Sequence, residues 1–150
     1  MKLRYILFVL IVGTLGGIAY YGISPLFKNI RLDELAPATE TKNTELLQKS
    51  AAVIGTLAHP ASGSVRIIKD SKKMYLRYEN FKTINGPDLF VYLSKDKDAT
   101  NFVNLGSLKA TEGNINYEIP ANVNINDYQY ALTWCRQFGV LFNSADLSSI

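Results

Sequence analysis

The sequence predicts an all-β domain, an antiparallel β-sandwich or barrel-like fold, behind one N-terminal transmembrane helix. The helix is indicated by 19 residues without a charge, from Tyr5 to Ile23. At about 1.5 Å per residue, such a helix covers most of the hydrocarbon thickness of a bilayer. The β domain is indicated by the chain after Val53, where short runs rich in Val, Ile, Tyr and Phe are separated by turn residues at intervals typical of strands.

The apolar run favours an uncleaved signal anchor over a secretory signal that is removed. It is longer than the apolar part of a cleavable signal, and the pair Tyr20 and Tyr21 is typical of an aromatic anchor at the membrane interface. The alternative is a cleaved signal, for which the one tolerable small-residue site lies at Gly17–Ala19. We therefore expect a tail at residues 1–4 and a transmembrane signal anchor at residues 5–23.

The charges that flank the run favour a domain outside the cytoplasm. The amino terminus, Lys2 and Arg4 lie on the short side, against Lys28 and Arg31 on the other side. The more positive side usually stays in the cytoplasm. This predicts a cytoplasmic tail and a single-pass membrane protein whose domain is extracytoplasmic, either periplasmic or on the cell surface.

The rest of the chain divides into a stalk and a domain. Residues 24–52 mix prolines and charges without a sustained hydrophobic period, which predicts a stalk, and residues 53–150 form the domain. The connections between its predicted strands are too short for parallel crossovers, so an antiparallel arrangement is expected. The candidate strands are Val53–Leu57, Ser64–Lys69, Met74–Phe81, Leu89–Ser94, Phe102–Leu105, Tyr117–Ile119, Tyr130–Arg136 and Val140–Phe142.

Alternation along the strand near the C-terminus predicts one core face and one open face, because successive strand side chains point to opposite sides. The bulky members, which we expect to form core, are Tyr130, Leu132 and Trp134. The small members, which leave room for a partner group or a pocket, are Ala131, Thr133 and Cys135.

Composition excludes several kinds of site. The net charge is +3, but Lys2 and Arg4 precede the span, and the other basic and acidic residues are interspersed, so no nucleic acid partner is expected. The chain has one cysteine, Cys135, and one histidine, His59. These counts exclude an internal disulfide, a site with several cysteine ligands and an HExxH motif, and no metal site is predicted.

Four stretches of the chain resemble a known family. The runs are GTLAHPASGSV, YENFKTINGPDLFVYLS, NLGSLKATEGNINYEIP and YALTWCRQFGVLFNSADL, in this order and at this spacing. Together they resemble the DM-thirteen domain, which occurs in Skeletor-type animal proteins and as a membrane-anchored single-domain form in bacteria. The resemblance spans residues 53–147. It implies a β-rich extracytoplasmic module that takes part in redox or electron transfer.

The resemblance centres on Cys135, the counterpart of the family cysteine, as a redox thiol or as a ligand to a prosthetic group such as haem. From the residues alone, Cys135 is better interpreted as a small core residue, and the family resemblance brings the two interpretations to about equal weight. His59 is a candidate ligand for such a group, against a hydrogen-bonding loop histidine. Asp88, in the turn Asn85–Asp88, is a candidate neighbour of the site, although folding alone explains this turn. The identity of a cofactor is left open.

Two functions from different classes follow. The first is a membrane-anchored redox or electron-transfer accessory module that acts through Cys135, with a redox or cell-envelope protein as partner, since one thiol and one imidazole need help for such chemistry. The second is a non-catalytic envelope binding or interaction domain with Cys135 in its core. An accessory module is favoured over an independent enzyme. Gly13 and Gly17 have a spacing that lets two helices approach as a homodimer, although glycine is common in spans.

Overall fold

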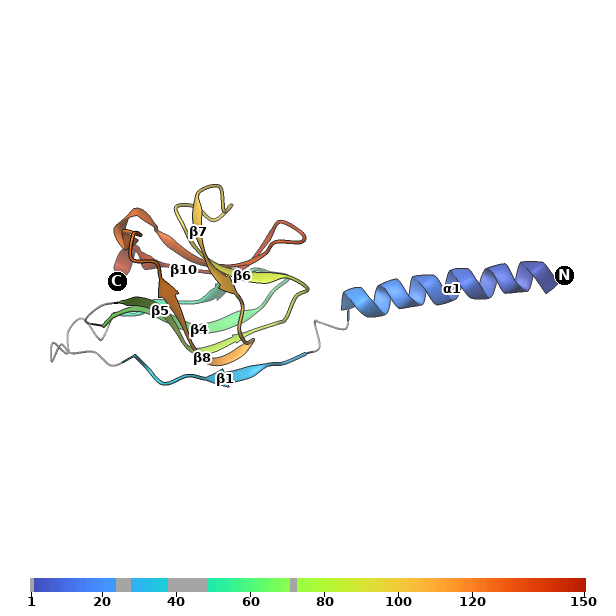
Figure 1. Ribbon diagram of the computed structural model, residues 1–150, viewed down its shortest axis with the longest axis horizontal. Coiled ribbons are helices and arrows are strands. Elements are labelled where there is room, and N and C mark those ends of the chain that lie inside the picture. The colour runs from blue at the N-terminus through green and yellow to red at the C-terminus, as the bar shows by residue number, and fades with distance from the viewer. Residues whose placement is uncertain (1, 24–27, 38–48, 71–72) are drawn as a thin grey trace.

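The computed structural model describes residues 2–23, 28–37, 49–70 and 73–150. These residues form one long helix and a sandwich of two five-stranded sheets (Figure 1), which confirms the predicted fold class. The elements are α1 (Lys2–Ile23), β1 (Arg31–Asp33), β2 (Ala51–Ala52), β3 (Ile54–Gly55), β4 (Ala61–Lys69), β5 (Met74–Thr83), β6 (Leu89–Ser94), β7 (Phe102–Ser107), β8 (Glu112–Ile119), β9 (Tyr130–Cys135) and β10 (Val140–Asp146), with short 3-10 helices at Ile125–Asp127 and Leu147–Ser149.

Helix α1 stands apart from the core of the domain. Its window Arg4–Tyr21 is long and apolar enough to cross a membrane. The side chains described in this window are exposed and make no part of the sandwich core (Figure 1). An apolar helix that buries nothing within its own molecule is typical of a segment whose solvent is lipid or whose apolar surface is covered elsewhere.

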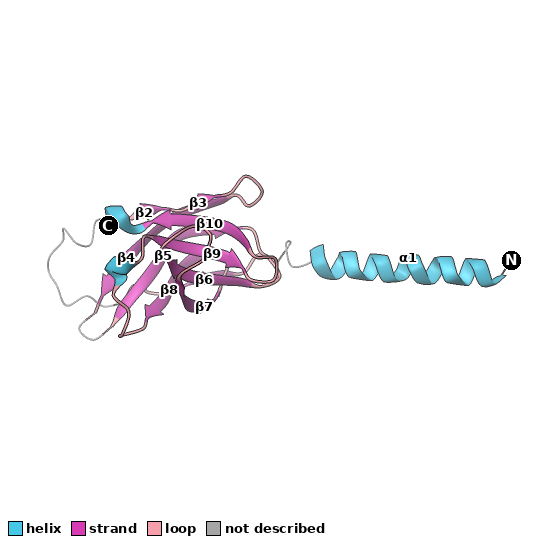
Figure 2. Cartoon of the chain, turned by 90° about the horizontal axis from the view of Figure 1, so that it is seen from above, coloured by secondary structure: helices cyan, strands magenta, loops and turns pink. Residues whose placement is uncertain are grey.

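The two sheets have different strand orders. Sheet A runs β1-β8-β5-β4-β2, and sheet B runs β3-β10-β9-β6-β7, as Figure 2 shows for the second sheet. Every neighbouring pair is antiparallel except β1 and β8, which are parallel. The mostly antiparallel sheet expected from the short connections is therefore confirmed, with one parallel strand added at the edge of sheet A.

The orientation of β9 is the reverse of the prediction. Ala131 belongs to the core between the sheets, and Thr133 and Cys135 are fully buried on the same face. The larger residues of β9 point outward, where Trp134 pairs with Phe90 and is only half-buried. The predicted core face of Tyr130, Leu132 and Trp134 is thus wrong, although neighbouring side chains on the outer surface cover Leu132 completely.

The cause of this reversal lies on the opposite sheet. Tyr78, Phe81 and Tyr117 of sheet A point into the sandwich, with ring centroids 4.6 Å apart for Tyr78 and Phe81 and 6.0 Å apart for Tyr78 and Tyr117. Interiors are packed to crystal density, so a layer of rings on one sheet requires short side chains opposite it. The small face of β9 meets that requirement.

Strand β8 begins at Glu112, five residues before its predicted start at Tyr117. Gly113, which precedes the predicted strand Tyr117–Ile119, is inside β8 at φ 118° and pairs with Leu32 of β1. A Cβ atom at Gly113 would lie 2.1 Å from the carbonyl oxygen of Leu32. The glycine therefore permits β1 to approach the sheet, and its meaning could be recognised only with β1 in place.

Strand β1 lies within the predicted stalk. The carbonyl oxygen of Ile30 accepts hydrogen bonds from the amides of Thr111 at 2.8 Å and Glu112 at 3.0 Å. The amide of Glu34 donates to the carbonyl of Asn114 at 2.8 Å, and Asn85 Nδ2 donates to the carbonyl of Lys28 at 3.2 Å. We call residues 28–35 the entry segment. This part of the chain is held to sheet A along its length.

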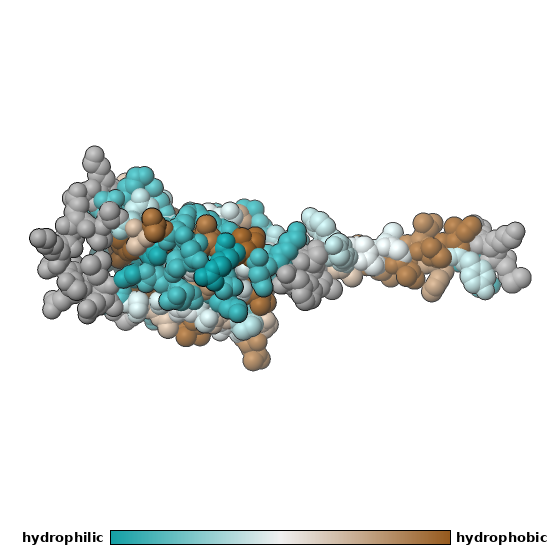
Figure 3. All heavy atoms as spheres, turned by 90° about the horizontal axis from the view of Figure 1, so that it is seen from below, coloured by the Kyte–Doolittle hydropathy of each residue, from teal (hydrophilic) through white to brown (hydrophobic). Residues whose placement is uncertain are grey.

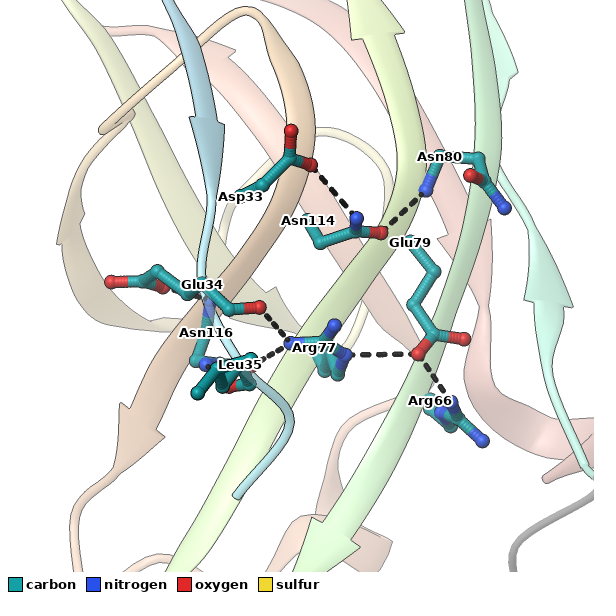
Figure 4. Close-up of polar contacts among 9 residues, drawn as sticks. All are labelled: Asp33, Glu34, Leu35, Arg66, Arg77, Glu79, Asn80, Asn114 and Asn116. Carbon is teal, nitrogen blue, oxygen red and sulfur yellow. Dashed lines mark hydrogen bonds and ion pairs between the residues drawn. The ribbon is translucent and has the colours of Figure 1, made fainter.

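A buried arginine on the outer face of sheet A anchors the entry segment (Figure 4). The Arg77 side chain is only 7% exposed, and its Nη1 donates to Asn116 Oδ1 at 2.7 Å and to the carbonyl of Glu34 at 3.1 Å. Its Nε donates to Glu79 Oε1 at 2.9 Å, and Arg66 donates to the same carboxylate oxygen. Glu79 thus bridges two arginines that lie opposite each other in the register of β4 and β5. The surrounding face is largely hydrophilic (Figure 3).

The lowered pKa of Glu79 should make the free energy of unfolding depend on pH in the acid range. Burial opposes ionisation of Glu79, but the hydrogen bonds and charges of Arg66 and Arg77 outweigh it and hold the pKa of Glu79 below its ordinary value. A lowered folded-state pKa stabilises the fold above the unfolded value of about 4.3, and this stabilisation is lost as the pH falls through the folded value. We expect Glu79→Gln to lower the free energy of unfolding by about 2 kcal/mol at pH 7 and to weaken its decline in acid.

Urea unfolding followed by tryptophan fluorescence between pH 7 and pH 3 checks this. Glu118→Gln is the matched control, because its ion pair with Lys73 at 2.8 Å is half-exposed on both sides. Such a surface pair contributes less than about 1 kcal/mol. Equal losses in the two variants, or an unchanged acid dependence in Glu79→Gln, would contradict the role given to Arg77 and Glu79.

The entry segment should stabilise the isolated domain. We expect a fragment that begins at residue 28 to be more stable, by about 2 kcal/mol, than one that begins at residue 44, because only the first keeps the cover over Arg77 and the hydrogen bonds of Ile30 and Glu34. Chemical denaturation followed by circular dichroism compares the two. Identical unfolding midpoints would mean that β1 is a passive edge of the sheet.

Candidate functional site

Cys135, the last residue of β9, lies wholly inside the sandwich. It is a free thiol with 0% exposure. The register of β9 and β6 sets Cys135 opposite Leu89, and both side chains pack with Phe142 in a small apolar cluster separate from the main core. We call Cys135, Leu89 and Phe142 the thiol cluster. The small face of β9, which we expected to admit a partner group, is therefore closed in this structure.

His59 reaches the thiol cluster from the loop between β3 and β4. Its ring stacks on the ring of Phe142, with centroids 3.8 Å apart and planes inclined by 17°. Its Nδ1 lies 2.8 Å from Thr56 Oγ1, in a hydrogen bond that fixes the ring from the loop side. The imidazole is half-buried and forms an outer lid on Phe142, with Phe142 between it and the apolar interior of the cluster.

The turn between β5 and β6 closes the cluster from another side. A Cβ atom at Gly86 would lie 2.9 Å from Phe142 Cζ and 3.0 Å from Leu89 Cδ2. Only glycine lets the backbone of this turn lie so close to both side chains. The Asn85 side chain caps the turn, since its Oδ1 accepts a hydrogen bond from the Gly86 amide at 2.9 Å. The sequence signal in this turn is therefore explained at least in part by packing on the thiol cluster.

Asp88 holds the chain that leaves β9. Its carbonyl accepts a hydrogen bond from the Arg136 amide at 2.9 Å, and its Oδ2 accepts one from Arg136 Nε at 2.9 Å. The Arg136 guanidinium also lies 4.2 Å from the ring centroid of Phe90, on the outer face of sheet B. Asp88 is thus adjacent to the thiol cluster along the backbone. The charge of Arg136 is directed outward and away from the thiol.

The structure brings His59, Asp88 and Cys135 to one end of sheet B, where three connections meet over the thiol cluster. Leu108, from the connection between β7 and β8, packs against the same cluster. Each of the four sequence runs singled out above therefore contributes a residue to this end. Sequence reasoning missed Phe142, the side chain that joins His59 to Cys135, and the only signal for it was its place in the fourth run.

The comparison with known families agrees with this convergence. The model of the family described as electron transfer DM13 matches residues 54–147. The chain belongs to the electron transfer DM13 family. The match begins in β3 and extends through β10, so it includes every residue of the thiol cluster, and it leaves α1 and β1 outside. No curated protein and no solved structure matches the chain. Membership of the DM13 family supports a redox-related role.

Buried oxygens lie beside the thiol cluster in this DM13 domain. Thr133 shares the inner face of β9 with Cys135, and its Oγ1 makes no hydrogen bond of good geometry within the described residues. The same is true of Asn143 Oδ1 and of the Tyr78 hydroxyl, whereas Asn143 Nδ2 donates to Thr83 Oγ1 at 3.2 Å. Burial raises the pKa of Tyr78, and the neighbouring Thr133 hydroxyl offsets this only in part. Buried polar atoms normally have partners of good geometry, so these oxygens are polar exceptions in an otherwise apolar interior.

The surroundings of Cys135 do not fit haem. Leu89 and Phe142 pack directly on the thiol, and Ile84 and Leu108 close the sides, so a macrocycle on the sulfur would displace the cluster and the β5–β6 turn. The His59 ring stacks on Phe142 and is separated from the sulfur by that side chain. Among the described residues, no group of three or more His, Cys, Asp and Glu side chains is placed to hold a metal ion.

The Thr133 hydroxyl, which makes no hydrogen bond of good geometry, should cost stability. Replacing Thr133 by valine keeps the shape and removes a buried oxygen, so we expect the free energy of unfolding to rise by about 1 kcal/mol. Chemical denaturation of the two proteins measures the change, with Thr111→Val as control, because Thr111 Oγ1 is also buried but accepts the Ile30 amide at 2.9 Å. Loss of stability in Thr133→Val would show that the hydroxyl has a bound partner in solution.

Proposed function

We propose that this chain is a membrane-anchored, extracytoplasmic electron-transfer accessory module in which Cys135 is the redox residue. The observation that carries the proposal is the meeting of all four family runs at the only thiol of the chain, within a domain of the electron transfer DM13 family. Four separate parts of the sequence contribute a residue to the thiol cluster or to the side chains that pack on it. A cysteine with a purely structural role needs only well-packed strands around it. It does not require particular residues in the connections as well.

Anchoring is supported by the length and exposure of α1. The helix has 22 residues, or about 33 Å at 1.5 Å per residue, which matches the hydrocarbon thickness of a bilayer. The positive charges of Lys2 and Arg4 on its short side support a cytoplasmic amino terminus and a domain on the other side of the membrane.

The chemistry that a single thiol offers to a partner is thiol–disulfide exchange. The Cys135 thiolate attacks one sulfur of a partner disulfide, a bond forms between these two sulfurs, and the partner's S–S bond breaks. The departing sulfur takes the bonding electron pair and a proton, so Cys135 is oxidised and the partner releases one thiol. Because Cys135 is fully buried, this step requires local opening of the connections over the thiol cluster.

His59 is the residue placed to control that opening. Its stack on Phe142 and its hydrogen bond to Thr56 fasten the β3–β4 loop over the cluster. Among the interactions described for this loop, the stack of His59 on Phe142 is the one side-chain contact with the thiol cluster. In this proposal His59 is a positioning residue that regulates access to the sulfur.

The second function is a non-catalytic envelope interaction domain in which Cys135 is a core residue. The complete burial of the thiol among Leu89 and Phe142 favours it. The two functions differ in one measurable property. A redox thiol is reached through local opening of the native domain, and a core thiol is reached only when the domain unfolds.

Reaction of the full chain, in its membrane, with glutathione disulfide separates the two functions. We expect a mixed disulfide on the natural chain and none on Cys135→Ser. We expect His59→Ala to speed its formation about fivefold, because a ring stack contributes about 1 kcal/mol to keeping the loop closed. Mass spectrometry of timed samples measures the rate.

Glu79→Gln provides the matched control, since it weakens sheet A far from the thiol cluster. Under local opening its rate equals that of the natural chain. If both variants speed the reaction in proportion to their loss of global stability, or if the thiol reacts only in denaturant, Cys135 is a core residue and the interaction domain replaces the redox module.

A further inference from the structure

The covalent chain fixes which end of the domain lies near the membrane. Helix α1 ends at Ile23, and the entry segment begins at Lys28, whose carbonyl is held by Asn85. Five residues span at most about 18 Å even when fully extended. Lys28 therefore lies within about 18 Å of the end of the helix, Asn85 is bonded directly to it, and the polar region of a bilayer occupies part of that distance.

The register of the strands shows what else lies at this end. Ala61, the first residue of β4, pairs with Thr83, the last of β5, so the β3–β4 loop lies beside the Asn85 turn. The Arg136 amide bonds to the carbonyl of Asp88, so the β9–β10 turn lies beside it too. We call this end, with the β3–β4 loop, the Asn85 turn and the β9–β10 turn, the proximal end. It is the end that contains the thiol cluster.

Large apolar side chains project into solvent from the proximal end. Leu57 of the β3–β4 loop is fully exposed, and Phe138 of the β9–β10 turn is 63% exposed. Val140 and Ile30, at the same end, are also exposed. Figure 3 shows hydrophobic residues that protrude from the domain at its end toward the linker, in contrast to the hydrophilic face of sheet A. Large apolar side chains gathered on neighbouring loops at one end of a domain are suited to contact with a partner protein or a membrane.

We propose that the proximal end docks on the lipid bilayer, with Leu57 and Phe138 inserted at the level of the headgroups and upper acyl chains. The proposal rests on the membrane anchoring of the proposed function. The occupant is lipid because the tether holds this surface within reach of the bilayer for as long as the chain is anchored. Phenylalanine and leucine on loop tips are side chains that insert at the interface.

Docking in this way turns the thiol cluster toward the membrane. The connections that must open to expose Cys135 are the same ones that carry Leu57 and the Asn85 turn. The partner that reaches the thiol then approaches at the bilayer surface, so it is itself membrane-bound or membrane-associated. The outer faces of both sheets stay in solvent.

Single-tryptophan reporters in the full chain test this. The chain has one tryptophan, Trp134, so Trp134→Phe removes the background. In that protein, Phe138→Trp and Leu57→Trp place reporters on two proximal tips. Phe102→Trp is the control, since Phe102 is 43% exposed and pairs with Ser94 at the opposite end of β6. Each variant is reconstituted into phosphatidylcholine vesicles with and without bromine on the upper acyl chain.

Brominated lipid is expected to quench the two proximal reporters by about half, as for side chains about 5–10 Å into the headgroup and acyl boundary, and to leave the control unchanged. Quenching equal to that of Phe102→Trp overturns the proposal. A blue-shifted proximal reporter that brominated lipid does not quench also overturns it, because a protein or a second copy of the chain then covers the tips. Where Trp134→Phe unfolds the domain, the same variants are made in the natural chain and its signal is subtracted.

Alkaline carbonate extraction distinguishes a failure of the membrane anchoring from a failure of the docking. A chain that is released from membranes has no anchor, and the proposed function fails with it. A chain that stays in the membrane while its proximal reporters remain unquenched is anchored, and only the docking is refuted.

Discussion

The packing of large rings on one sheet against small side chains on the other determines where the thiol of this domain lies. Sheet A fills the interior with Tyr78, Phe81 and Tyr117, so β9 of sheet B has to present Ala131, Thr133 and Cys135 to it. The only thiol of the chain is inside for that reason. The same constraint sends Trp134 to the outer face, where it lies across from Phe90.

Burial of the thiol transfers control of its reactivity from the strands to the connections. The strands on either side of Cys135 are fixed by continuous ladders, whereas the end of the sandwich is closed by a histidine stack, a glycine turn and an aspartate–arginine pair. Local opening occurs where few buried contacts hold a segment. In the proposed function, the half-buried His59 loop is the cover whose opening exposes the sulfur.

The sequence predicted what depends on local pattern. Leu89–Ser94 was predicted to the residue, because turn residues and a lysine bound a run of β-forming side chains on both sides. The faces of β9 could not be assigned, since alternation separates two faces without saying which one meets the other sheet. Strand β1 was missed because its three residues carry little pattern of their own and are held by contacts with residues about 80 positions away.

The candidate site shows the same division. Cys135, His59 and Asp88 were proposed from their residue types and the family resemblance, but Phe142, the side chain that joins His59 to Cys135, looks like an ordinary strand residue. It occupies the irregular step between Leu141 and Asn143 in the pairing of β10 with β9, which turns its ring toward Cys135. A bulge of this kind has no reliable signature in a single sequence.

The short link between α1 and the entry segment gives the domain a built-in orientation. A long flexible stalk would let the domain present any face to the membrane, but here the carbonyls of Lys28 and Ile30 are already bonded to the domain, and Arg77 holds the carbonyl of Glu34. Only the few residues before Lys28 remain between the helix and a rigid sandwich. The buried charges on sheet A thus do more than stabilise an edge strand. By fastening the entry segment they determine which end of the sandwich lies nearest to α1, and that end is the one where the DM13 family runs meet at the thiol cluster.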